Sequence, residues 1–90
     1  MPRLDYVRQT PEEISVTYAD MPPMTEVLFV STTSGEEKTP SSSIALSDGG
    51  GGAADIPIPS DPALPKGRYY LLALNRHQKY LAQTVPFYIN

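Results

Sequence analysis

The sequence predicts an all-β fold, and three observations lead to that prediction. The 90 residues include ten prolines, about twice the average usage, which divide the chain into pieces too short for several long helices. Apolar and polar residues alternate with period two in several segments, as in half-buried strands. The C-terminal third is the most apolar part and has the pattern of a β-hairpin. The length predicts one domain, residues 1–90, with one modest core.

The pattern of residues 64–90 predicts a β-hairpin, and we expect the rest of the chain to pack against it. After a Pro/Gly turn, residues 69–74 (YYLLAL) show no polar alternation, which favours a central strand. A helix is the alternative. Gly67 and the polar break at residues 75–78 leave too short a segment for one, so the strand is preferred.

Further strands are predicted at residues 3–9, 13–19, 25–32 and 54–59 and in the return segment of the hairpin, residues 79–89. Thr10 and Pro11 resemble a capped helix start, but the alternation that follows them favours a strand. Pro57 and Pro59 are expected to protect an edge. Pro86 cannot donate to a ladder, so it is expected at an edge or a bulge.

Three connecting segments are predicted. Residues 20–24 contain two consecutive prolines and predict a turn. Residues 33–53 predict a loop interrupted by a short apolar patch at residues 43–46, and the glycine run 49–52 is expected to be mobile. Residues 60–64 suggest one capped helical turn.

The hairpin entry, Leu64-Pro65-x-Gly67-x-Tyr69 before an apolar strand, resembles the turn into the penultimate strand of immunoglobulin-like and fibronectin-III-like domains. The resemblance implies an immunoglobulin-like antiparallel β-sandwich of six to seven strands. It also implies that the Tyr69 hydroxyl anchors this corner, with Tyr70 as the alternative.

Over most of its length the chain is similar to the C-terminal immunoglobulin-like domain of the galactose oxidase and glyoxal oxidase family. The corresponding pieces are residues 65–74, 75–78 and 87–89. That family carries a copper-binding histidine in the loop after the third strand. Residues 31–43 contain no histidine, so the copper role does not carry over. The resemblance is one of fold and does not establish function.

Composition and motifs argue against most kinds of chemistry. The net charge is −3, with −7 in residues 1–61 and +4 in residues 62–90, which argues against a nucleic-acid partner. There is no cysteine and no apolar stretch of membrane-spanning length, so neither a thiolate metal site nor a membrane partner is expected. The segment 48–55 lacks the features of a P-loop or an EF-hand. His77 is the single histidine and no acidic residue follows Asp61, so we expect neither an enzyme nor a cofactor.

Period two predicts which residues of the hairpin carry function. If Tyr69 and its alternating neighbours Leu71 and Ala73 enter the core, the residues between them lie on the opposite face. Leu28 or Val27, together with Tyr80 and Ala82, are expected beside those residues. The predicted binding residues are Arg68, Tyr70, Leu72, Leu74, Arg76, Lys79 and Tyr80.

An apolar face with a cationic rim is typical of a docking surface. The hypothesis is a non-catalytic module that docks on another protein or on a domain of its parent chain. The alternative function is a carbohydrate-binding module that uses exposed tyrosines. A structural alternative is that residues 34–47 fold over the same face.

Overall fold

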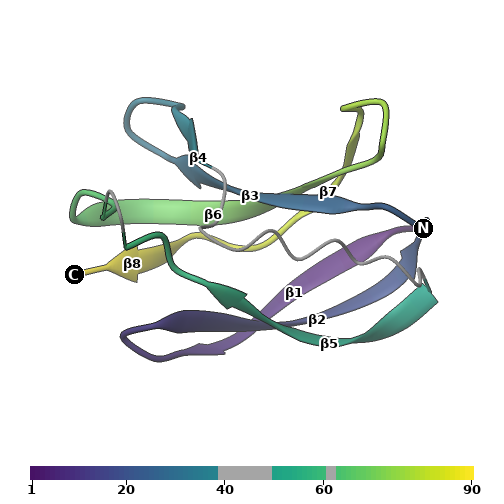
Figure 1. The fold of residues 1–90 in the computed structure, drawn as a ribbon, viewed down its shortest axis with the longest axis horizontal. Helices are drawn as coiled ribbons and strands as arrows, with labels where there is room; N and C mark the ends of the chain where they lie inside the picture. Colours follow the sequence, from purple (N-terminus) through teal and green to yellow (C-terminus); the bar gives the residue numbers. More distant parts are fainter. Residues whose placement is uncertain (39–49, 61–62) are drawn as a thin grey trace.

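The computed structural model describes residues 1–38, 50–60 and 63–90. Figure 1 shows two layers of strands facing each other, with β3, β4, β6 and β7 in one layer and β1, β2 and β5 in the other. No helix occurs in the described part of the chain, and therefore none long and apolar enough to cross a membrane. The strands are β1 (Arg3–Gln9), β2 (Glu13–Met21), β3 (Glu26–Ser31), β4 (Glu37–Lys38), β5 (Gly50–Pro57), β6 (Gly67–Leu74), β7 (Tyr80–Gln83) and β8 (Phe87–Ile89).

Both sheets are antiparallel. One has the order β1-β2-β5, and the other has the order β4-β3-β6-β7 with β8 also paired to β6. Because β7 and β8 pair with opposite ends of β6, they form two parts of one interrupted edge strand. Counted in that way, the described residues contain seven strands. The predicted all-β sandwich is confirmed.

The strand predictions are confirmed to within a few residues for β1, β2, β3 and the hairpin. Strict alternation along β1 would place Arg8 on the side of Leu4 and Tyr6. A bulge shifts the register after Tyr6, and Arg8 pairs with Ser15 on the outer face. The inserted residue, Val7, is 54% exposed.

The glycine run was expected to be a mobile loop, and this expectation was wrong for its described part. Gly50 to Gly52 form the start of β5. The sequence pattern had predicted this edge strand only at residues 54–59. Gly52 pairs with Tyr18, and a Cβ at Gly52 would lie 3.2 Å from the Tyr18 hydroxyl oxygen. Gly52 therefore leaves room for the Tyr18 ring. The prediction considered only the flexibility of glycine and did not consider this close packing within a strand.

The segment resembling a helix start is a turn between β1 and β2. The Thr10 hydroxyl accepts hydrogen bonds from the backbone N–H groups of Glu12 and Glu13, both at 3.2 Å. The Thr10 N–H donates to the Glu13 carbonyl oxygen at 2.9 Å, which closes the turn. A capping threonine thus satisfies the turn's donors in the same way as it would cap a helix.

Two predictions for the connections concern residues outside the description. The apolar patch at residues 43–46 falls there entirely. Asp61 and Pro62, at the centre of the expected helical turn, fall there as well, while Ser60 and Ala63 form an isolated antiparallel bridge. Residues 33–38 were predicted as loop, but their last two residues form the short strand β4.

The hairpin positions β6 at the centre of its sheet, between β3 and the edge formed by β7 and β8. Its tip is held by the Asn75 side-chain oxygen, which accepts from the N–H groups of His77 (2.8 Å) and Lys79 (3.0 Å). The interruption before Pro86 is tied to β6 by Thr84. The buried Thr84 hydroxyl accepts from the Leu71 N–H at 3.0 Å. Pro86 thus lies at an irregularity in an edge strand, as predicted.

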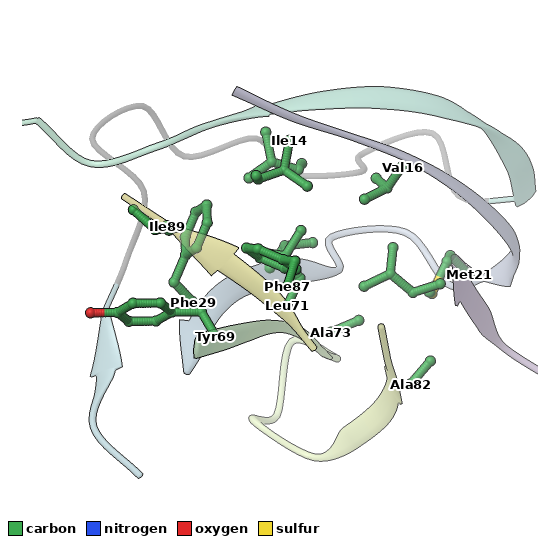
Figure 2. Packing of buried hydrophobic residues seen from close by; sticks show 13 residues of the cluster. Ile14, Val16, Met21, Phe29, Tyr69, Leu71, Ala73, Ala82, Phe87 and Ile89 are labelled. Carbon is green, nitrogen blue, oxygen red and sulfur yellow. The ribbon is translucent and has the colours of Figure 1, made fainter. Parts of the chain in front are cut away.

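The core lies between the two sheets and contains a run of three aromatic rings. Phe29 of β3 is fully buried and contacts Phe87 of β8 edge-on, with ring centroids 6.3 Å apart. Phe87 in turn stacks on Tyr6 of β1 at 5.4 Å. Figure 2 shows Phe29 and Phe87 among the buried side chains that both sheets contribute. These rings therefore connect the sheets through the middle of the sandwich.

Tyr69 occupies the corner that the sequence assigned to it. Its ring is buried and its hydroxyl donates to the Pro65 carbonyl oxygen at 2.7 Å. We expect Tyr69→Phe to lower the free energy of unfolding by about 1 kcal/mol, the net value of one hydrogen bond. Tyr70→Phe is the matched control and should change it little. Urea denaturation measures both, and a larger loss from the Tyr70 variant would contradict the assignment.

Candidate functional site

The two sheets present outer faces of different chemistry. On the three-stranded sheet the outer face is polar. There Arg3 pairs with Asp5 at 3.3 Å, and the Ser15 hydroxyl donates to Asp55 at 2.7 Å. Thr17 is exposed between them. This is the pattern of a sheet face that contacts water.

The outer face of the five-stranded sheet is apolar in its centre. Leu71 and Ala73 point into the core, so Tyr70, Leu72 and Leu74 point outward. Cross-strand pairing adds two side chains from β3, with Leu28 opposite Leu72 and Val30 opposite Tyr70. We call these five outward side chains the apolar face: Leu28, Val30, Tyr70, Leu72 and Leu74.

Exposure varies across the apolar face. Leu28, Val30 and Leu74 are 8%, 4% and 8% exposed, although they lie outside the core cluster between the sheets. Tyr70 and Leu72 are half-buried. Leu72 and Tyr70 on the central strand are therefore the accessible part of the face.

Two tyrosines flank the apolar face at opposite ends. Tyr80 lies opposite Leu74 and is 62% exposed, and Tyr88 lies opposite Arg68 and is 60% exposed. The prediction that Ala82 lies beside Tyr70, Leu72 and Leu74 on this face was wrong. Ala82 pairs with Ala73 and belongs to the core, because a bulge near Leu74 shifts the register of β7. Of the two β3 candidates, Leu28 faces outward and Val27 belongs to the core.

The predicted cations lie around the apolar face, and their places differ. Arg68 is exposed at the start of β6, on the face itself. Arg76 is exposed at the hairpin tip, where its Nε donates to His77 Nε2 at 3.3 Å, and Lys79 follows the tip. Among the described residues none of these three cations forms an ion pair with a carboxylate.

The pairing register adds residues to the face that reasoning from β6 alone missed. Glu26 lies opposite Leu74, and Glu37 of β4 lies opposite Val30, so both carboxylates are at its β3/β4 side. Tyr88 and Val30 were missed as well. The alternation within residues 25–32 was visible, but which of its faces meets Leu72 depends on the register between two strands far apart in sequence.

His77, the single histidine of the sequence, is exposed at the hairpin tip. A hollow of about 300 Å³ separates the hairpin tip from the β2–β3 turn, and no carboxylate lines it. Its lining residues are Pro22, Pro23, Met24, Asn75, Arg76 and His77. The described residues also contain no cluster of three or more potential metal ligands. His77 thus has no orienting acid in this hollow, which general acid–base chemistry would require.

Neither the family comparison nor the search of curated proteins gives a match for this sequence. Among solved structures, the chain is similar to β-glucosidase from Kluyveromyces marxianus in complex with glucose, with a TM-score of 0.57 and 14% identity. The match covers 100% of this chain and 14% of that chain. Selenomethionine-labelled β-glucosidase from the same organism matches with a TM-score of 0.54, 14% identity and the same coverage. The chain spans about a seventh of those proteins, and at this identity the likeness is one of fold.

Proposed function

We propose that this chain is a non-catalytic β-sandwich module that docks on another protein or domain through the apolar face. The observation that carries the proposal is the contrast between its two outer faces. One is polar and contains its own ion pair, whereas the other carries three leucines, a valine and a tyrosine. An antiparallel sheet with one face on the core normally presents polar residues on its other face.

The proposal includes a narrower fold class, immunoglobulin-like and close to fibronectin III. Its support is the division of strands into β1-β2-β5 and β4-β3-β6-β7, with a tyrosine corner at the start of β6. Such sandwiches host many unrelated functions, so the fold class alone assigns none. The similarity of one segment of a much longer chain agrees with a module that works beside other domains.

Photo-crosslinking in cells that express the protein tests docking directly. With p-benzoylphenylalanine in place of Tyr80, at the edge of the apolar face, we expect a discrete adduct of higher mass. The same group in place of Thr17, on the opposite polar sheet, should give none. Adding Leu72→Glu should abolish the Tyr80 adduct, because a charged side chain in the centre of the face must be desolvated on docking.

Three results would refute docking through this face: no adduct from position 80, equal adducts from both positions, or an adduct that persists in the Leu72→Glu variant. The mass of the adduct also identifies the occupant. A second copy of the chain gives twice the mass of the monomer, while another protein gives a different sum.

Carbohydrate binding is a second candidate because three tyrosines share this face. Tyr88 is exposed and lies opposite Arg68 of β6. Tyr70 is the next residue of β6 after Arg68 on the same face. Aromatic rings of this kind form stacking platforms for sugars. Titration with oligosaccharides, followed by tyrosine fluorescence, should then saturate in the native chain and fail in Tyr88→Ala. No saturable change would exclude this candidate.

A further inference from the structure

The charged residues around the apolar face are divided between its two sides. The carboxylates Glu26 and Glu37 belong to β3 and β4. The cations Arg68, Arg76 and Lys79 belong to β6 and the hairpin tip beyond it. No ion pair within the described residues joins the two groups. The face is therefore acidic along one side and basic along the other, with its apolar centre between them.

At each end of the face along the strand direction, a carboxylate on one side is matched by a cation on the other side. Glu26 lies opposite Leu74, at the end of β6 that leads to Arg76 in the tip. Glu37 lies beside Val30, and Val30 is opposite Tyr70, two residues from Arg68. Each end of the face thus carries one carboxylate on one side and at least one cation on the other.

We infer that the occupant of the apolar face is a second copy of this chain, related by a two-fold axis that runs between β3 and β6, parallel to the strands. This inference rests on the proposed docking function and names its partner. The sheet order β4-β3-β6-β7 has β3 and β6 at its centre. Rotation about that axis lays β3 of each copy over β6 of the other, in the aligned packing that two sheets adopt about 10 Å apart.

The same rotation places complementary groups opposite one another. Leu28 meets Leu72 of the second copy, and Val30 meets Tyr70 of the second copy. Glu26 comes to the hairpin tip of the second copy, and Glu37 comes to the end where β8 carries Tyr88 beside Arg68. Each contact occurs twice, because a two-fold interface is isologous. A partner with a face of one charge sign would leave half of these groups opposed by like charge.

The size of the face predicts a weak dimer. Four strands about 4.8 Å apart and roughly 20 Å long give each copy a footprint of about 400 Å². Leu28, Val30 and Leu74 are already buried within the chain, so the accessible area lost on association is well below the roughly 800 Å² that a standard specific interface buries on each partner. We therefore expect a dissociation constant on the order of 0.1 to 1 mM for the isolated chain. The apolar centre supplies the attraction, and the charges determine which orientation is allowed.

A charge-swap experiment tests the arrangement without any other ligand. One variant, Glu26→Lys with Glu37→Lys, has an entirely basic rim. The other, Arg68→Glu with Arg76→Glu and Lys79→Glu, has an entirely acidic rim. We expect each alone to raise the dissociation constant at least tenfold, because like charges then oppose each other across the axis. An equimolar mixture should form a heterodimer at least as tight as the native homodimer. Sedimentation velocity measures all three.

The matched control reverses two exposed charges elsewhere, Arg8→Glu with Glu12→Lys, and should leave the dimer unchanged. A native chain that remains monomeric up to about 1 mM, or a mixture that fails to associate, would overturn the second copy as occupant. The docking function would survive that result if position 80 cross-links to a different protein. If position 80 gives no adduct either, both proposals fail.

Discussion

Replacement of Phe29 by alanine should lower the free energy of unfolding by about 3 to 5 kcal/mol, the range measured for large-to-small changes at buried aromatic positions. The side chain is 0% exposed and contacts Phe87, which stacks on Tyr6 of the other sheet. Its loss removes the β3 end of the aromatic connection between β3 and β1. A domain of this size has a total stability of roughly 5 to 13 kcal/mol, so the variant should retain only part of it.

Urea denaturation followed by far-ultraviolet circular dichroism measures this loss. Phe29→Leu is the matched control, because it keeps most of the apolar volume and should cost less than about 1.5 kcal/mol. A loss below about 1 kcal/mol for the alanine variant would mean that Phe29 does not connect the sheets.

Local patterns were sufficient to predict most of this fold. Alternation in residues 13–19 and the apolar run 69–74 predicted strands because side chains on a pleated strand alternate between faces. The resemblance carried by the Leu-Pro-x-Gly-x-Tyr entry predicted that the Tyr69 hydroxyl anchors this corner, and the hydroxyl donates to the Pro65 carbonyl oxygen. The constraint in each case lies within a few residues of the chain.

What could not be predicted depends on partners distant in sequence. Gly52 belongs to a strand through its pairing with Tyr18, whose ring lies close to it, and Ala82 enters the core because a bulge shifts its register. The acidic side of the candidate face was missed for the same reason. Glu26 and Glu37 join it only through the pairing of β3 with β6 and β4, which no single segment encodes.

Two adjacent leucines on β6 should differ in how much stability the domain loses when each is replaced by glutamate. Leu71 is 0% exposed and belongs to the core between the sheets, whereas Leu72 is half-buried on the apolar face. Leu71→Glu buries a charge with no partner, a cost of several kcal/mol that should unfold the domain. Leu72→Glu directs its carboxylate outward to water, and its cost should stay within about 1 kcal/mol.

The free energy of unfolding of the isolated Leu72→Glu chain, measured in urea beside Leu71→Glu, is therefore the most direct test that this face is free to dock. The docking account predicts a folded Leu72 variant within about 1 kcal/mol of the native chain and an unfolded Leu71 variant. Unfolding of both would contradict it, because Leu72 would then be core, as expected if residues 34–47 cover this face.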